Sequence, residues 1–154
     1  MADYDLAILG GGPGGYVAAI RGAQLGLKTC IVEKDKLGGI CLNWGCIPTK
    51  ALLKNAEVYN TIKNANKYGI KVDNISVDFP ANVKRSRDVS NRLSKGIEFL
   101  MKKNKITHIH GMGKLTSKTT IETTSGKKKE MVNAKKTIIA TGAHPRTFPG
   151  MEID

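Results

Sequence analysis

The chain has 154 residues, of which 40% are hydrophobic and 5% aromatic, and it carries a formal net charge of +12. This length suffices for one domain with a buried core and is too short for two domains of ordinary size. No apolar run approaches the roughly 20 residues of a membrane-spanning helix, and Asp3 and Asp5 with the glycines after them argue against a secretory signal peptide. We therefore expect a cytoplasmic protein with no membrane partner.

The positive charge is concentrated in one region. Residues 51–136 hold nineteen Lys or Arg against seven acids, whereas residues 1–50 hold five against four. A basic nucleic-acid binder is one interpretation of this excess. We favour a solvated lysine-rich surface and no nucleic-acid partner, because no aromatic residues interleave with the basic ones to stack on bases.

The first predicted elements are a strand, a glycine-rich turn and a helix. An apolar run over residues 4–9 predicts a buried parallel strand, and Gly10, Gly12 and Gly15 then complete the spacing GxGxxG. The following helix is expected to end at Gly26. Its expected packing residues are Val17, Ala18, Ala19, Ile20, Ala23 and Leu25.

A second strand is predicted over residues 29–32 and ends at Glu33, twenty-one residues after Gly12. In this arrangement glycines let backbone approach a pyrophosphate, the helix N-terminus faces the negative charge, and the acid accepts hydrogen bonds from a ribose. Strand, glycines, helix, strand and acid in this register predict a dinucleotide site.

The next stretch, residues 37–50, reads LGGICLNWGCIPTK and holds two cysteines five positions apart. On a regular helix such residues have Cα atoms about 8 to 9 Å apart, whereas a disulfide needs about 7 Å or less. If Cys41 and Cys46 are bonded, residues 42–45 must therefore depart from helical geometry, and Gly45 supplies the freedom to do so.

Pro48 favours a helix that begins near it, because proline is tolerated in the first turn. Cys46 is then expected just ahead of a helix N-terminus, where the partial positive charge favours the thiolate, and Lys50 adds a cation one turn on. These features predict a reactive, reversible dithiol. The alternative is a pair of reduced, inert cysteines, which is also our expectation for Cys30.

A dithiol eight residues beyond Glu33 decides between two cofactors. A nicotinamide delivers hydride to a diffusing substrate and needs no dithiol beside it, whereas a flavin exchanges electrons with a disulfide near its ring. FAD is therefore the predicted cofactor.

Two long helices are expected after the dithiol. The first runs from residue 48 to 68 and stops at Gly69, and a connector over 71–77, with room for a short strand, leads to a second helix from Pro80 with Asp78 near its N-terminus. The expected packing residues are Leu52, Ala56, Tyr59, Ile62 and Ala65 in the first helix and Val89, Leu93, Ile97 and Leu100 in the second.

A third strand is predicted over residues 105–110. His108 and His110 share one face of it, but no third ligand is in view, so we expect no metal site. Gly113 follows the strand's carboxyl end, where this fold lets a ligand ring approach the backbone.

Residues 114–133 predict an antiparallel excursion of two or three strands with a turn at Ser125 and Gly126, and its lysine run is typical of a protected sheet edge. A buried strand then begins at residue 137 and leaves through Thr141 and Gly142. The predicted fold class is α/β, a Rossmann-like FAD-binding domain over residues 1–154 with a parallel sheet, flanking helices and a small antiparallel excursion.

Three segments carry a family resemblance: GGGPGGYVAAIRGAQLGL with Glu33, then LGGICLNWGCIPTKALL, then IIATGAHPR. Together they resemble the flavoprotein disulfide reductases, and within that family the branch that oxidises dihydrolipoamide. Glutathione and mercuric reductases have related segments that typically read CVNVGCVP.

The resemblance implies a role for each matching residue. Cys41 is implied as the interchange thiol, Cys46 as the thiolate against the flavin, and Lys50 as a group that tunes the flavin potential. Gly113 is implied near the adenine. The other residues implied in FAD binding are Gly10, Gly12, Pro13, Gly14, Gly15, Glu33, Lys34, Gly38, Gly39, Ile40, Cys41, Ala140, Thr141 and Gly142.

In the family's cycle, electrons pass from dihydrolipoamide through the disulfide and FAD to NAD. The implied partners are a second copy of the chain and the lipoyl domain of an oxo-acid dehydrogenase or glycine cleavage complex. The segments that bind NAD and form the dimer are not in these 154 residues, so we expect an N-terminal portion that is inactive alone. The alternatives are a related disulfide reductase and a free-standing FAD-binding redox module.

Overall fold

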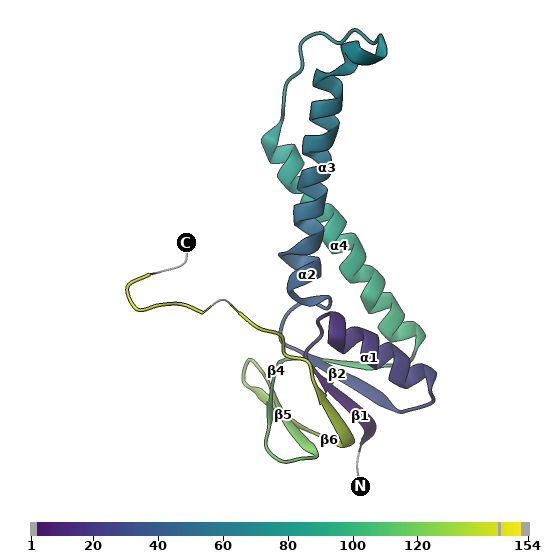
Figure 1. Ribbon diagram of the computed structural model, residues 1–154. Coiled ribbons are helices and arrows are strands. Elements are labelled where there is room, and N and C mark those ends of the chain that lie inside the picture. Colours follow the sequence, from purple (N-terminus) through teal and green to yellow (C-terminus); the bar gives the residue numbers. More distant parts are fainter. Residues whose placement is uncertain (1–2, 145, 152–154) are drawn as a thin grey trace.

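The computed structural model describes residues 3–144 and 146–151. Its six strands form one sheet in the order β3-β2-β1-β6-β5-β4 (Figure 1). In chain order the elements are β1 (Tyr4–Leu9), α1 (Pro13–Gln24), β2 (Thr29–Glu33), α2 (Gly39–Asn43), α3 (Cys46–Lys63), the 3₁₀ helix η1 (Ala65–Tyr68), α4 (Phe79–Lys103), β3 (Thr107–His110), β4 (Met112–Leu115), β5 (Thr120–Ser125) and β6 (Lys128–Ile139).

The sheet has a parallel part and an antiparallel part that share β6. Strands β3, β2, β1 and the second half of β6 are parallel, whereas β4, β5 and the first half of β6 are antiparallel. The turn between β5 and β6 includes Gly126, which has a φ of +59°. The predicted α/β fold with an antiparallel excursion is confirmed.

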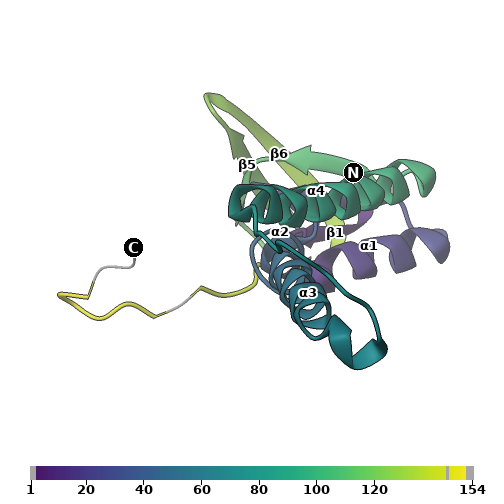
Figure 2. The same cartoon turned by 90° about the horizontal axis from the view of Figure 1, so that it is seen from above.

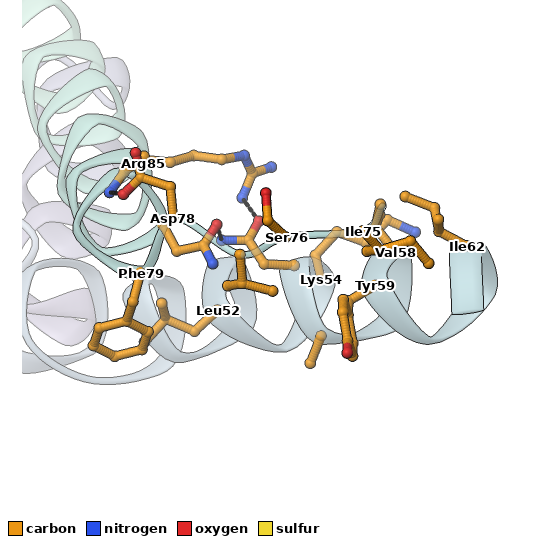
Figure 3. Close-up of a pocket in the computed structure, with 15 residues that line it drawn as sticks. Leu52, Lys54, Val58, Tyr59, Ile62, Ile75, Ser76, Asp78, Phe79 and Arg85 are labelled. Carbon is orange, nitrogen blue, oxygen red and sulfur yellow. Dashed lines mark hydrogen bonds between the residues drawn. The ribbon is translucent and has the colours of Figure 1, made fainter. Parts of the chain in front are cut away.

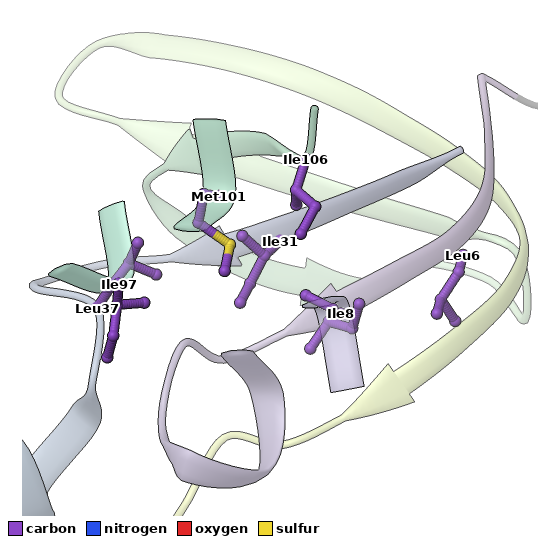
Figure 4. Close-up of a cluster of buried hydrophobic side chains, with 8 residues drawn as sticks. Leu6, Ile8, Ile31, Leu37, Ile97, Met101 and Ile106 are labelled. Atoms are coloured by element: carbon purple, nitrogen blue, oxygen red, sulfur yellow. The ribbon is translucent and has the colours of Figure 1, made fainter. Parts of the chain in front are cut away.

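Each face of the parallel sheet has its own core. Helices α1 and α4 cover one face, which Figure 4 shows with the side chains of Leu6, Ile8, Ala19, Ile31, Leu37, Ile97, Met101 and Ile106. Against the other face pack the antiparallel strands, through Ala7, Leu9, Cys30, Val32, Ile121, Val132 and Ala134. Burial on both faces explains why β1 and β2 are apolar without alternation.

Helices α3 and α4 form a long hairpin that rises away from the sheet (Figures 1 and 2). The predicted packing face of α4 is wrong at Leu93 and Leu100, which are 42% and 36% exposed, whereas Ile97 is buried and Val89 is half-buried. The buried residues are instead Ser86, Ser90, Ser94, Ile97 and Met101. Small serines spaced four apart let α4 approach its neighbours closely, and their hydroxyls are hydrogen-bonded to carbonyls, so their burial costs little.

Helix α3 also differs from its prediction. It begins at Cys46, two residues before Pro48, which still lies in its first turn, and it ends at Lys63 before η1, which Gly69 terminates with a φ of +72°. Of the predicted packing residues only Ala65 is buried. Leu52, Ala56, Tyr59 and Ile62 are exposed and line an apolar cleft of about 710 Å³ between α3 and residues 75–85 (Figure 3).

The predicted role of Asp78 at the start of α4 is confirmed, because Asp78 is the N-cap and its carboxylate accepts a hydrogen bond from Ala81 N–H at 3.0 Å. Other local predictions are corrected, and no strand forms in the connector 71–77. The predicted packing residues Val17 and Leu25 of α1 are exposed. The strand predicted to be buried from residue 137 is the end of β6, and its Ile138 and Ile139 side chains are exposed. Within the described ranges, no helix combines the length and apolarity needed to cross a membrane.

Two glycines, one in a crowded position and one in an open position, provide a test of the packing. A Cβ on Gly15 would collide with the carbonyl of Gly10, whereas a Cβ on Gly96, inside α4, would meet nothing within 4 Å. We expect Gly15→Ala to lower the free energy of unfolding by about 1 to 3 kcal/mol. Gly96→Ala should raise it by about 0.5 to 1 kcal/mol, because alanine favours helix. Urea unfolding measures both, and equal effects would contradict the packing described.

Cys30 in β2 is fully buried, and this burial raises the pKa of its thiol to about 12. The unfolded thiol titrates near 8.5, so its contribution to stability is complete below about pH 8.5 and is lost as the pH rises toward 12. We expect a thiol-reactive disulfide reagent at pH 8 to detect two cysteines in the native chain and three in urea. In the Cys30→Ala variant, the number of reactive thiols should fall by one in urea and stay the same in the native chain. Rapid reaction of a third thiol in the native wild type would show that β2 opens.

Candidate functional site

The glycine-rich loop between β1 and α1 packs against two other loops. Gly10 has a φ of +106°, and a Cβ there would collide with the carbonyl of Ala140 after β6. Gly39, at the start of α2, has a φ of +60°, and its Cβ would lie 2.7 Å from the Cα of Gly12. Gly38 N–H also donates to the carbonyl of Gly11 at 2.8 Å. Only residues without side chains allow this approach.

Glu33 at the end of β2 closes the same turn. Its carboxylate accepts hydrogen bonds from Gly11 N–H at 2.6 Å and from Asp35 N–H at 2.8 Å. The predicted ribose-binding acid is therefore held at the glycine loop by main-chain donors.

The segment between the two cysteines breaks helical geometry as predicted. Helix α2 carries Cys41 and ends at Asn43, Trp44 and Gly45 form the link, and α3 begins at Cys46. A Cβ on Gly45 would lie 3.1 Å from the carbonyl oxygen of Ile40, so the chain turns back closely on α2. Cys46 is thus the first residue of α3 and not, as expected, the residue just ahead of the helix.

Cys41 and Cys46 are both free thiols in the structure. The pKa of Cys41 is raised, first because its side chain is hydrogen-bonded to Cys46, then by desolvation and by the negative charge that Cys46 can carry. Lys50, one turn into α3, acts in the opposite direction on the pKa of Cys41. The Cys46 side chain thus lies close enough to that of Cys41 to influence its pKa.

A cavity of about 910 Å³ opens between the glycine loop, the dithiol loop and the segment after β6. Eleven residues of the predicted FAD site line it: Gly12, Pro13, Gly14, Glu33, Lys34, Gly39, Ile40, Cys41, Ala140, Thr141 and Gly142. Gly10, Gly15 and Gly38 instead shape the loops behind it, and Cys46 and Lys50 do not line it. The cavity lies at the carboxyl ends of parallel strands, where ligands bind in such folds.

Gly113 lies in a neighbouring cavity of about 100 Å³, together with Gly10, Glu33 and Thr141. A Cβ on Gly113 would lie 3.0 Å from the Cγ1 of Val32. This glycine thus lets β4 pack on the parallel sheet, while the predicted contact with an adenine remains a prediction.

Five residues of the large cavity were missed by sequence reasoning: Asp35, Lys36, Trp44, Ala143 and His144. Asp35 and Lys36 could have been inferred, because they directly follow Glu33 at the carboxyl end of β2. Trp44 could have been inferred from its place between the cysteines. Position 145 of the segment 137–146 lies outside the described residues.

The two histidines of β3 have a different setting. The pKa of His108 is lowered by its partial burial and then by the neighbouring His110. Over the part of the chain that the structure describes, no three His, Cys, Asp or Glu side chains gather closely enough to hold a metal ion.

The residues present fit an FAD molecule. The N-cap of α1 is Gly12, which offers no side-chain cap to the first N–H groups of the helix. A Cβ on Gly14 would find its nearest neighbour 4.0 Å away, so the space above the turn is open. Free helix N–H groups beneath open space suit a pyrophosphate, and Cys41 on the same cavity wall suits a redox-active ring.

Comparisons with known proteins agree with this geometry. Residues 4–154 match the pyridine nucleotide-disulphide oxidoreductase family. A dihydrolipoyl dehydrogenase of Zymomonas mobilis is 52% identical over 157 residues, which cover 100% of this chain and 34% of that protein. A dihydrolipoyl dehydrogenase of Bacillus subtilis is 47% identical over 161 residues, which cover 99% of this chain and 34% of that protein.

A similar solved structure is the Cu(II) complex of the HOCl-induced flavoprotein disulfide reductase RclA from Escherichia coli. Its TM-score is 0.80 at 24% identity, and the match covers 97% of this chain and 31% of that one, so this likeness concerns the fold. The chain spans about one third of the length of the curated relatives that it matches. With its family match, its relatives and its fold in agreement, the chain belongs to the pyridine nucleotide-disulphide oxidoreductases.

Proposed function

We propose that this chain is the FAD-binding, disulfide-bearing part of a dihydrolipoyl dehydrogenase, which oxidises dihydrolipoamide and passes the electrons through a Cys41–Cys46 disulfide and FAD to NAD. The observation that carries the proposal is that Cys41, in contact with Cys46, lies on the wall of the cavity formed by the glycine loop. The relatives named dihydrolipoyl dehydrogenase support the choice of substrate.

The dithiol seen here is the reduced state of the exchange. When a dihydrolipoamide sulfur attacks Cys41 of the Cys41–Cys46 disulfide, a mixed disulfide forms on Cys41 and the sulfur of Cys46 leaves. The second substrate sulfur then attacks the first and displaces Cys41. The substrate ends as a cyclic disulfide, and the two electrons and two protons that it loses reside on the two cysteines. Bound FAD would supply the acceptor for those electrons.

The hydrogen bond between the cysteines supports a division of labour. The neighbouring Cys46 raises the pKa of Cys41, so Cys41 keeps its proton to a higher pH than an ordinary thiol. The family resemblance assigns Cys41 to exchange with substrate and Cys46 to the flavin side, and of the two only Cys41 lines the cavity in this structure. Lys50 would stand one turn away with its positive charge.

The glycine loop and Glu33 would hold the ADP half of FAD, and residues 140–142 its outer edge. NAD, a second copy of the chain and a lipoyl domain of an oxo-acid dehydrogenase or glycine cleavage complex would bind mainly through segments that the longer relatives have beyond this match. We place the protein in the cytoplasm as part of the same proposal.

We expect the purified chain to bind added FAD and, after two-electron reduction, to show a new long-wavelength absorbance band from a thiolate in contact with the ring. Cys46→Ser should abolish this band while leaving FAD bound, and Cys30→Ser should retain it, because Cys30 lies in the opposite core. Titration by absorbance spectroscopy measures both. FAD bound with no band in the wild type would refute the proposed role of Cys46, and DNA retained with no FAD bound would favour a basic nucleic-acid binder.

We also expect Cys46→Ala to lower the pKa of Cys41. The substitution removes the hydrogen bond and the neighbouring charge that raise this pKa, and it leaves Lys50, which lowers it. The thiolate absorbance near 240 nm should then rise at a lower pH than in Cys46-containing chain. Cys30→Ala serves as the background control for both titrations, and an unchanged or higher midpoint would contradict the sulfur–sulfur contact.

A further inference from the structure

Side chains of helix α4 donate hydrogen bonds to backbone carbonyls of the dithiol segment. Arg87 donates from Nη1 to the carbonyl of Asn43 at 3.1 Å, and Ser94 donates from Oγ to the carbonyl of Leu37 at 2.9 Å. Between these two points, Asn43 donates from Nδ2 to the carbonyls of Leu37 and Gly39 at 3.1 and 3.0 Å. Both ends of the segment that carries Cys41 are thus tied to a helix more than forty residues away in sequence.

The contact with Asn43 is the more consequential of the two. Asn43 is the last residue of α2, a helix of five residues. So short a helix is unstable by itself, and its last carbonyls have no partner within it. Arg87 supplies a donor at the point where the chain leaves α2 for Trp44 and Gly45. The planar guanidinium holds its donors in a fixed orientation, so it defines the position of that carbonyl.

We propose that Arg87 is a positioning residue for the Cys41–Cys46 pair: it fixes the end of α2, so that the turn through Trp44 and Gly45 brings Cys46 against Cys41. The proposal rests on the proposed function only in requiring that the pair cycle between dithiol and disulfide. Closing the disulfide joins the two Sγ atoms and releases two electrons and two protons. In the test below, oxidised glutathione accepts them and becomes two glutathione thiols.

Loss of the Arg87 contact should make the disulfide less favourable. A disulfide forms readily when two sulfurs are held near each other, because little freedom remains to be lost on bonding. If α2 frays at Asn43, Cys41 and Cys46 sample more separations and the equilibrium shifts toward the dithiol. The same loosening should appear in the segment that joins the cysteines.

Arg85 provides a matched control on the same helix. It donates from Nη1 to the carbonyl of Ala51 at 3.1 Å and to Oδ1 of Asn55 at 3.0 Å, and Figure 3 shows it reaching across to α3. Arg85→Met therefore removes the same kind of side chain and the same kind of carbonyl contact. Its partners lie in α3 beyond the dithiol, so it should leave α2 in place.

The experiment equilibrates the purified chain with glutathione buffers, quenches it in acid and measures the Cys41–Cys46 disulfide by mass spectrometry. We expect Arg87→Met to lower the equilibrium constant for disulfide formation about tenfold, which is about 30 mV for a two-electron couple. Arg87→Lys, which keeps a charged donor, should recover most of this loss. Arg85→Met should stay within about twofold of the wild type.

A second readout comes from Trp44, the single tryptophan of the chain, which lies between Asn43 and Gly45 and is 53% exposed. We expect quenching of its fluorescence by acrylamide to increase in Arg87→Met and in Arg87→Gln and to stay unchanged in Arg85→Met. Far-UV circular dichroism selects the variants that are folded, and Arg87→Lys provides a conservative variant if Arg87→Met is not.

The outcomes separate the two proposals. Wild-type chain that forms no reversible Cys41–Cys46 disulfide would overturn both the proposed function and the role of Arg87. A normal wild-type equilibrium with unchanged constants and unchanged Trp44 quenching in the folded Arg87 variants would overturn the role of Arg87 alone. An equal loss of the equilibrium constant in Arg85→Met would also overturn the role of Arg87, because the loss would then come from a change in the whole α3–α4 hairpin.

Discussion

The site depends on backbone packing against backbone at the carboxyl edge of the parallel strands. Gly10 meets the carbonyl of Ala140, and Gly12 meets Gly39, at distances that leave no room for a Cβ. This contact brings together three segments that are up to 130 residues apart in the chain. A side chain at Gly10 would push the turn away from the segment after β6, and one at Gly39 would push the dithiol loop away from the turn, so the common cavity would be lost.

The sheet supports this contact through burial on both faces. Helices α1 and α4 cover one side and the antiparallel strands cover the other, so β1 and β2 cannot shift without moving both cores. Helix α4 then continues past the sheet and holds the dithiol segment. One helix therefore serves as core, as support for α2 and as half of the α3–α4 hairpin.

What the sequence could predict is what local geometry decides. The break between Cys41 and Cys46 follows from the spacing of the two residues and the presence of Gly45, and the β1–α1–β2 unit follows from its glycines and apolar runs. Helix α2 could not be predicted, because partners on α4 more than forty positions away hold its segment.

The predictions of which helix faces are buried were wrong for a related reason. Apolar periodicity identified Leu93 and Leu100 in α4, but close approach to α2 and α3 favours small side chains, so serines are buried instead. In α3 the periodicity is present, yet Leu52, Tyr59 and Ile62 border an open cleft. Periodicity thus identifies a helix, whereas the surface that it buries depends on neighbours. For the FAD site, the cavity gathers most of the expected residues but leaves five outside it: Gly10, Gly15, Gly38, Lys50 and Gly113.

Strand β6 belongs to two ladders at once. Its first half is paired with β5 and its second half with β1, and Val132 and Ala134 near the junction are 2% and 1% exposed. A slip of one residue would displace the strand by about 3.3 Å and turn every side chain to the opposite face. Both ladders would have to slip together. The register of β6 therefore fixes the position of Ala140, directly after the strand, relative to the glycine loop. An insertion of one residue should therefore be tolerated at the Gly126 turn and disruptive at position 133.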